Sequence, residues 1–289
     1  MDQAEKLRNL VAKHEIIRPG LSTTMRVIAI TSGKGGVGKT NLAINLGIYL
    51  TRANKRVVVV DADFGLANVE VLLGVSPRYS FKDVLTSEVS IVDALTTGPE
   101  GVRFLSGGSG LTQLADITDS QMAILIAGFT QLDSLADILI IDTGAGMSKN
   151  VTNFLKAAHE TIVVTTSDPT SVTDAYAIIK IMTENSTNLP RFRIVVNRVE
   201  TQKEGTEVFS RLYRVCNRFL DVKPVNLGII PYDKYLIRAV KSQEPVSLMY
   251  PYSESSRSIE IISRRLLHET GVESTGIKQF IERLIGIKK

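Results

Sequence analysis

The sequence predicts an α/β fold, a doubly wound and mostly parallel sheet flanked by helices. Short runs rich in β-branched residues alternate with stretches of helical periodicity, a pattern typical of strand–helix–strand units. Several runs are apolar at every position, such as Val57–Val60 and Ile138–Ile141. Strands of this kind are covered on both faces, as in parallel sheets. Because 44% of the 289 residues are hydrophobic, the chain has ample apolar material for such a core.

Along the chain, seven strands are expected, with helical stretches such as Leu42–Tyr49 and Val172–Met182 between them. The sequence shows no internal repeat, so residues 25–271 are expected to form one domain. Residues 1–24 are a polar segment before it, and residues 272–289 are a further helical segment after a glycine-containing break. The expected strands are Arg26–Thr31, Arg56–Val60, Val102–Leu105, Ile138–Ile141, Thr161–Thr165, Arg193–Val196 and Val225–Ile230.

Composition limits the classes of protein that this chain can be. Its one cysteine, Cys216, excludes a disulfide within the chain and a cysteine-based metal or iron–sulfur site built by a single chain. It also favours a reducing, cytosolic compartment. We expect neither a signal segment nor a membrane span, because the first residues are polar and no apolar run is long enough. The net charge of +4 allows weak attraction to nucleic acid or anionic lipid without requiring it.

The segment from Gly33 to Thr40 matches the phosphate-binding P-loop pattern, G-x4-G-K-[ST]. It lies between the first expected strand and a helical stretch, which is the context that this motif requires. The glycines let backbone N–H groups converge on phosphate oxygens, and the start of the helix adds a favourable dipole. We expect Lys39 to meet the β- and γ-phosphates of a nucleotide and Thr40 to bind Mg²⁺.

The same loop, Lys34–Thr40, resembles the deviant Walker A motif of the MinD/ParA ATPase family. The resemblance implies that ATP is bound with Mg²⁺, and that Lys34 crosses a homodimer interface to touch the nucleotide of the second copy. From the residues alone, Lys34 is explained equally well as a solvated loop lysine. The nucleotide-binding residues that the resemblance implies in this loop are Gly35, Gly36, Val37, Gly38, Lys39, Thr40 and Asn41.

Acidic residues follow two expected strands, at the edge where ligands bind in parallel sheets. The segment Val59–Asn68 resembles the family's switch I, which implies that Asp63 orients the attacking water and that Asp61 supports the magnesium site. The segment Ile138–Gly146 resembles a strand running into switch II, which implies that Asp142 holds Mg²⁺. The alternative for the first two acids is a polar exit from a strand into a loop.

Two glycines of the second segment bear on switching. The resemblance implies that Gly144 donates its N–H to the γ-phosphate, and that Gly144 and Gly146 let the loop change shape when this phosphate leaves. Many relatives carry proline at position 144, so a looser switch is expected in this chain.

These roles together define a hydrolytic mechanism in which Lys34, Lys39 and Asp63 are the catalytic residues. Phosphoryl transfer needs mainly positioning and charge neutralisation. Lys39, Mg²⁺ and Lys34 from the second copy neutralise charge, and Asp63 places the water. A cation added in trans is worth roughly 10³–10⁵ in rate in other NTPases, so we expect the monomer to be nearly idle.

Two further strand ends resemble the family segments that flank adenine: Val195–Val199 and Ile229–Asp233. The resemblance implies that Asn197 and Pro231 lie beside the base. An asparagine amide can both donate to and accept from a purine edge. The alternative for Asn197 is a capping role in the protein itself.

The C-terminal segment is amphipathic. Its apolar residues recur at helical spacing on one face, and lysines and arginine stand beside them to meet anionic headgroups. Pattern alone favours a helix packed on the protein's own surface, whereas MinD-like proteins end in a membrane-targeting helix of this character. Both can hold if the helix docks in the monomer and is released in the ATP-bound dimer. The apolar residues are Ile277, Phe280, Ile281, Leu284 and Ile285.

The N-terminal segment distinguishes groups within the family, because simple MinD proteins begin almost directly at the first strand. Asp2-Gln3-Ala4 and Leu7-Arg8 resemble the activator motif of the FlhG (FleN, YlxH) group, the MinD-like regulators of flagellar number and placement. The resemblance implies that this motif binds and stimulates the FlhF GTPase, and that basal-body components are further partners. A frayed tail is the alternative reading of these residues.

Three other functions stay open from the sequence. A cell-division MinD would have no use for the N-terminal motif. A ParA-type DNA-segregation ATPase needs a basic patch on the dimer, and no specific nucleic acid is expected as a partner here. A metabolic P-loop enzyme, such as a synthetase, would need a substrate pocket for which the sequence shows no residues. The expected location is cytoplasmic, with peripheral attachment to the inner face of the bacterial cell membrane in the ATP-bound dimer.

Overall fold

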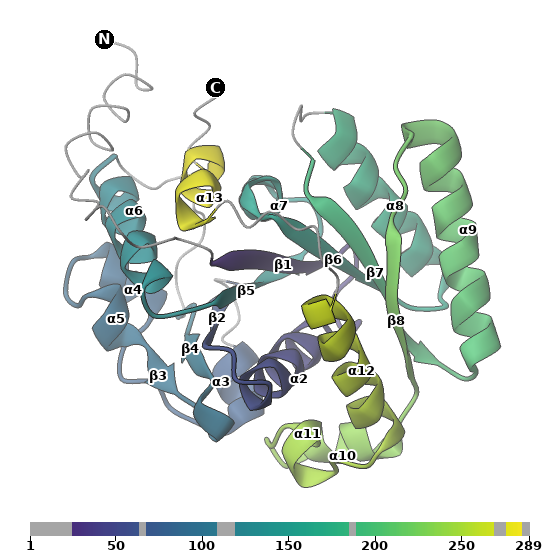
Figure 1. Ribbon diagram of the computed structural model, residues 1–289, viewed down its shortest axis with the longest axis horizontal. Coiled ribbons are helices and arrows are strands. Elements are labelled where there is room, and N and C mark those ends of the chain that lie inside the picture. Colours follow the sequence, from purple (N-terminus) through teal and green to yellow (C-terminus); the bar gives the residue numbers. More distant parts are fainter. Residues whose placement is uncertain (1–24, 64–67, 109–118, 185–188, 269–275, 285–289) are drawn as a thin grey trace.

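An eight-stranded sheet lies between two layers of helices in the computed structural model, which describes residues 25–63, 68–108, 119–184, 189–268 and 276–284 (Figure 1). The strand order is β3-β4-β2-β5-β1-β6-β7-β8. Neighbouring strands are parallel except at the β3–β4 edge. The strands are β1 (Arg26–Ser32), β2 (Val57–Ala62), β3 (Thr96–Thr97), β4 (Arg103–Leu105), β5 (Ile138–Ala145), β6 (Glu160–Thr165), β7 (Arg191–Val199) and β8 (Val225–Pro231).

The predicted fold class is confirmed, and each of the seven expected strands overlaps an observed one. The antiparallel strand β3 was not expected, because two residues are too few to show a periodic pattern. The apolar runs proved to be central strands: all six residues of β2 are buried, and so are the first six of β5. This is the double coverage that continuous apolar strands indicate.

Each face of the sheet has its own layer of helices, because alternate strand residues point to opposite faces. In β1, Val27 and Ala29 join one core, and Ile28 and Ile30 join the other. One core is covered by α4 (Phe81–Leu85), α5 (Ile91–Ala94), α6 (Asp119–Asp133), α7 (Lys149–Ala157), α8 (Pro169–Glu184), α9 (Gln202–Leu220) and α13 (Gly276–Leu284). The other is covered by α2 (Lys39–Arg52), α3 (Asn68–Leu73), α10 (Lys234–Lys241), α11 (Val246–Met249) and α12 (Glu254–His268). A short 3-10 turn, Pro99–Gly101, precedes β4.

The carboxyl edge of the parallel strands is where a ligand site is expected. Strand β1 is central: the chain passes to β2 and β5 on one side of it and to β6, β7 and β8 on the other. Such a reversal of strand order opens a crevice at the carboxyl ends of the strands. The loop after β1 enters this crevice, which places Gly33–Gly38 at the centre of the edge.

A buried ion network holds the amino edge of three strands. Glu160, the first residue of β6, pairs with Arg26 of β1 and with Arg193 of β7. Glu160 and Arg193 are fully buried, so each charge depends on its partner. The network fastens the end of the sheet opposite the P-loop.

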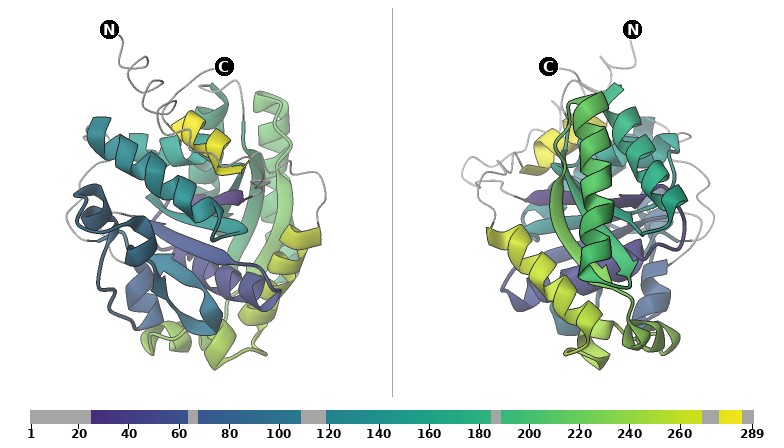
Figure 2. Two further views of the ribbon diagram at one scale, coloured as in Figure 1. Left: turned by 60° about the vertical axis from the view of Figure 1, so that its left-hand side comes forward. Right: turned by 90° about the vertical axis from the view of Figure 1, so that its right-hand side faces the viewer.

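The C-terminal helix α13 packs on the protein itself, in the same layer as α6 and α7 (Figure 2). Its apolar residues Ile277, Phe280 and Ile281 are buried, and Leu284 is half-buried. The rings of Phe280 and Phe129 of α6 meet edge to face, with centroids 5.4 Å apart. The structure therefore shows the docked arrangement of the two that the sequence left open for this face.

Some sequence predictions concern residues outside the described ranges, namely Asp2, Gln3, Ala4, Leu7, Arg8 and Ile285. None of the described helices has the length and apolar character needed to cross a bilayer.

Candidate functional site

The P-loop, Gly33–Gly38, joins the end of β1 to the start of α2, as its motif predicts. Gly36 and Gly38 have φ angles of 74° and 101°, in the left-handed region that favours glycine. At Gly38 a Cβ atom would also lie 2.4 Å from the Asn197 amide nitrogen. Both positions therefore require glycine, and the loop keeps its backbone N–H groups free of side chains at the start of the helix.

Lys39, Thr40 and Asp142 lie together beneath this loop. Lys39 is 8% exposed and Asp142 is 1% exposed. Burial raises the pKa of Asp142 to about 7, although the Thr40 hydroxyl and the Lys39 ammonium act to lower it. Both carboxylate oxygens of Asp142 are buried, and among the described residues none makes a hydrogen bond of normal geometry with them, although the Thr40 hydroxyl lies beside them. Buried polar atoms normally have partners, so this carboxylate is built for a ligand that completes it.

Asp61 lies beside Asp142, because the two residues pair across the parallel strands β2 and β5. Burial, and then the Asp142 carboxylate, raise the pKa of Asp61 to about 7. Unlike its neighbour, Asp61 is well supplied with donors: it accepts the backbone N–H groups of Asp63 at 3.0 Å, Asn68 at 3.0 Å and Val69 at 3.2 Å. Its carboxylate thus anchors the segment that carries Asp63, and a second carboxylate stands next to the unpartnered one.

Asp63 and Gly144, predicted to belong to two different switches, lie close to each other. A Cβ atom at Gly144 would lie 3.3 Å from an oxygen of the Asp63 carboxylate. Asn68 donates its side-chain N–H to the other oxygen of Asp63 at 3.3 Å. Gly146 has a φ of 93°, which favours glycine. The structure therefore brings the predicted switch residues to one place, next to Asp142.

Asn197 lies under the P-loop, at the end of β7. Its Nδ2 donates to the carbonyl of Val37 at 2.7 Å, and its Oδ1 accepts the N–H of Arg198 at 2.9 Å. The side chain is 3% exposed. These contacts favour the structural alternative for Asn197, since they fasten the P-loop to the sheet. Pro231 ends β8 beside Val199, so it lies at the same edge.

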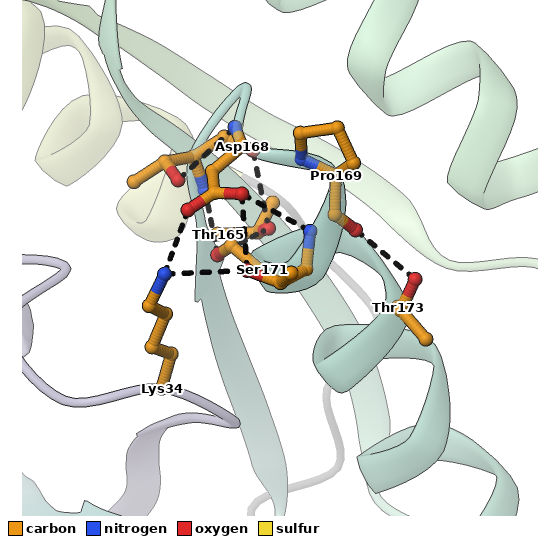
Figure 3. A network of polar contacts seen from close by, with 8 residues as sticks. Lys34, Thr165, Asp168, Pro169, Ser171 and Thr173 are labelled. Atoms are coloured by element: carbon orange, nitrogen blue, oxygen red, sulfur yellow. Dashed lines mark hydrogen bonds and ion pairs between the residues drawn. The ribbon is translucent and has the colours of Figure 1, made fainter.

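Lys34 projects from the P-loop and is held by the start of α8 (Figure 3). Its Nζ lies 2.7 Å from the Asp168 carboxylate and 3.2 Å from the Thr170 hydroxyl. The Lys34 and Thr170 hydrogen bonds hold the pKa of the Asp168 carboxyl below its usual range. Lys34 is 48% exposed at its side chain. The lysine is therefore paired within its own chain, yet remains accessible to a second copy.

Sequence reasoning missed Asp168 and Thr170, the partners of Lys34. They follow β6 at the carboxyl edge, and the rule that singled out Asp61 and Asp142 would have found them. Asn68 was also missed as a contact of Asp63, because its role depends on how the chain turns after β2.

The site suits a magnesium ion that is shared with a nucleotide. No group of three or more His, Cys, Asp or Glu is arranged to hold a metal in the part of the chain that the structure describes. Mg²⁺ is commonly bound by one or two carboxylates together with substrate phosphates. The unpartnered oxygens of Asp142 beside Thr40 fit that arrangement. When bound there, the ion would neutralise charge on the phosphates.

The fold and this edge define the class: a P-loop nucleotide-binding protein with a buried carboxylate beside its phosphate loop. A family model described as the CobQ/CobB/MinD/ParA nucleotide binding domain matches residues 28–246. This match spans most of the chain. The chain therefore belongs to the CobQ/CobB/MinD/ParA family, as its P-loop predicted.

Known proteins support the same placement. The chain is 39% identical over 242 residues to the antiactivator FleN of Pseudomonas aeruginosa. The matched region covers 84% of this chain and 86% of that protein. It is 34% identical over 266 residues to the flagellum site-determining protein YlxH of Helicobacter pylori, covering 90% of each. A chain of the MinC:MinD cell division protein complex of Aquifex aeolicus has the same fold, with a TM-score of 0.66, 27% identity, and coverage of 85% of this chain and 97% of that chain.

Proposed function

We propose that the protein is an ATP-driven switch that dimerises around its nucleotide and regulates the number or placement of flagella. One observation carries the enzymatic part: in the described part of the chain, the buried Asp142 carboxylate has no hydrogen-bond partner, and Lys39 and Thr40 lie beside it. This arrangement supports binding of ATP with Mg²⁺, with Lys39 on the phosphates and Thr40 and Asp142 toward the ion. Asp63, next to Gly144, stands where the two switch segments meet and is the residue that we assign to the attacking water.

In this proposal, dimerisation brings the Lys34 side chain of a second copy to the nucleotide as an additional cation. Lys34 is exposed and lies at the rim of the P-loop, so a facing copy can take it from Asp168. We expect Lys34→Ala to keep ATP binding but to lose dimerisation and to lose turnover by roughly 10³-fold or more. Turnover is measured by phosphate release and dimerisation by light scattering. Lys203→Ala, an exposed lysine of α9, is the matched control. Normal turnover of the Lys34 variant would sink the proposal.

Membrane attachment is assigned to α13. Fully burying each of Ile277, Phe280 and Ile281 is worth roughly 1.5–3 kcal/mol, and docking on α6 and α7 already provides this. Release to lipid therefore needs a second contribution, which basic residues near anionic lipid and the avidity of two helices in a dimer supply. The protein would then be cytoplasmic as a monomer and attached to the membrane's inner face as an ATP-bound dimer.

Liposome flotation tests this assignment. Deleting residues 274–289 should abolish ATP-dependent binding to anionic liposomes, while ATP binding remains. Undiminished flotation of the truncated protein would refute the role of α13.

The flagellar part of the proposal draws on the similarity to FleN and YlxH and on the N-terminal motif, Asp2-Gln3-Ala4 and Leu7-Arg8. We assign this motif to an FlhF-like GTPase, with flagellar basal-body components as further partners. The test is a GTPase assay of that partner with the full protein and with a variant lacking residues 1–20. A scrambled N-terminal sequence is the control. Equal GTPase rates with and without the segment would favour a cell-division role, and salt-sensitive DNA binding would favour a ParA-type one.

A further inference from the structure

A groove of about 750 Å³ lies between the last turns of α2 and the outer side of α12. It is separate from the nucleotide site. Helix α2 begins at the P-loop, and Tyr49 and Arg52, which line the groove, are ten and thirteen residues further on. At 1.5 Å per residue, the groove is roughly 15–20 Å from the phosphate loop. Helices α2 and α12, which flank the groove, lie in the opposite helix layer from α13, as Figures 1 and 2 show.

Three arginines surround this groove: Arg52, Arg257 and Arg264. Among the described residues that line the groove, the one acidic residue is Glu260, which pairs with Arg264 at 2.6 Å. Arg52 pairs with Glu100 at 2.9 Å, outside the groove. Arg257 has no carboxylate partner among the described residues, and its guanidinium lies 6.0 Å from the centre of the Tyr252 ring. The described lining therefore carries more positive than negative charge, and Arg257 has no carboxylate partner within it.

Apolar side chains are exposed within the same groove. Ile261 is 51% exposed and Tyr252 is 80% exposed, on α12 and on the segment before it. Leu267 is half-buried one turn and a half further along α12. Tyrosine and arginine are the residue types that most often carry binding energy in protein interfaces. An aliphatic strip with a basic rim is the complement of a partner segment that has apolar residues on one side and acidic residues around them.

We propose that the α2–α12 groove binds an acidic, aliphatic segment of a partner protein, with carboxylates at Arg257 and Arg264 and an apolar side chain against Ile261. Charge complementarity selects an acidic partner. The exposed strip selects a protein segment over a small anion, which would leave Ile261 and Tyr252 in water. A lipid surface is the weaker reading, because the helix assigned to the membrane belongs to the opposite layer.

The distance from the P-loop has a functional consequence. This consequence rests on the proposed dimer: if the two copies meet at the nucleotide edge, the α2–α12 groove stays open on both. Partner binding at this groove is therefore expected to be equally strong with and without ATP and Mg²⁺, and it does not depend on the proposed flagellar role.

The test uses the full chain and a fluorescein-labelled helical peptide of about twelve residues, some three turns. The peptide carries leucine at every third or fourth position and glutamate elsewhere, and a reference peptide has lysine for each glutamate. Fluorescence anisotropy measures binding at low and high salt. Arg257→Glu combined with Arg264→Glu reverses the groove charge, and Lys203→Glu combined with Arg214→Glu makes the same change on exposed residues of α9. Ile261→Ser probes the apolar strip, and unchanged ATPase activity shows that each variant is folded.

The expected result is binding of the acidic peptide alone, weakened at least roughly tenfold by the groove charge reversal and less by Ile261→Ser. The α9 variant should bind as the unaltered protein does. Absence of binding, or equal loss in both charge-reversed variants, would overturn the proposal. So would a groove charge reversal that removes binding to phosphatidylglycerol vesicles but leaves peptide binding intact, since that result identifies a lipid site.

Discussion

The carboxyl edge of the sheet and the surface of α6 and α7 on which α13 packs, called here the seat of α13, are organised in opposite ways. At the edge, Asp142 is buried, neither of its oxygens has a hydrogen-bond partner among the described residues, and a second buried carboxylate, Asp61, stands beside it. At the seat of α13, Ile277, Phe280 and Ile281 are buried in the hydrophobic core that α6 and α7 also cover. The first region is incomplete until something binds to it. The second is complete and must be opened before it can act elsewhere.

This difference indicates how a ligand could control the chain. Binding a cation and a nucleotide at the edge relieves a cost that the folded protein already bears. Opening α13 instead exposes apolar surface, so it needs compensation from a membrane or a partner. In the proposed function, a site that gains free energy on binding and a helix whose release costs free energy are the two halves of a switch.

The largest effect is expected at the edge. Lys39→Ala removes the buried cation that we assign to the phosphates, and it should lower turnover by roughly 10³–10⁵-fold. Phosphate release under saturating ATP measures this, with circular dichroism as the check on folding. If turnover fell only a few-fold, the edge would not be the catalytic site, and its contrast with the seat of α13 would not hold.

The seat of α13 should show its effect in stability. Phe280→Ala removes a fully buried ring that meets Phe129, and it should cost about 3–5 kcal/mol in the free energy of unfolding of the docked helix. Hydrogen exchange of α13 and urea denaturation both report this loss. Ile237→Ala, at a half-exposed position of α10, is the control and should change stability by less than about 0.5 kcal/mol. Equal effects of the two substitutions would mean that α13 is not docked in solution.

The buried carboxylates at the edge should also make the stability of the protein depend on pH. Burial raises the pKa of Asp142 from 3.8 to about 7. Between these two pH values, the carboxyl group is protonated in the folded protein and ionised in the unfolded chain. Stability from this group is therefore fully present below pH 4, falls as the pH rises toward 7, and is lost above it. Asp61 acts in the same direction.

Asp142→Asn removes the part of this pH dependence that comes from Asp142 and leaves the part from Asp61. Without ATP, the variant should be more stable than the unaltered protein at pH 8, by on the order of 2–3 kcal/mol, and should show a smaller difference at pH 5. It should also lose the stabilisation that Mg²⁺ with ATP confers. Urea denaturation at both pH values measures this, and a less stable variant at pH 8 would contradict the account of Asp142.

The smallest effect is expected at the rim of the edge. Asp168→Ala releases Lys34 from its partner within the chain, so dimerisation with ATP should become stronger, by less than roughly fivefold because exposed ion pairs contribute little. Analytical ultracentrifugation measures the dimerisation constant. Thr170→Val should change it less, since Thr170 is the more distant partner at 3.2 Å. Weaker dimerisation of the Asp168 variant would indicate that Asp168 itself contacts the second copy.

Much of the carboxyl edge could be predicted because its information is local. The P-loop is a short contiguous motif, and the strands before Asp61 and Asp142 are continuous apolar runs. The partners of these residues could not be read in the same way. Asn197 donates to the carbonyl of Val37 across 160 positions of sequence, and Lys34 meets Asp168 across 134. An asparagine at a strand end has the same local signature whether it faces a base or a backbone carbonyl.

The sequence by itself determined the fold class, the nucleotide loop and the apolar face of the C-terminal helix, because periodicity and motif spacing are properties of neighbouring residues. Only the tertiary structure decided what covers that face and which acid has no partner. Phe280 meets a ring on α6, and among the described residues Asp61 accepts three backbone N–H groups while Asp142 accepts none. Hydrogen-bond satisfaction and burial depend on which distant segments the sheet brings together, and that arrangement made one of two similar aspartates an anchor and left the other open to a ligand.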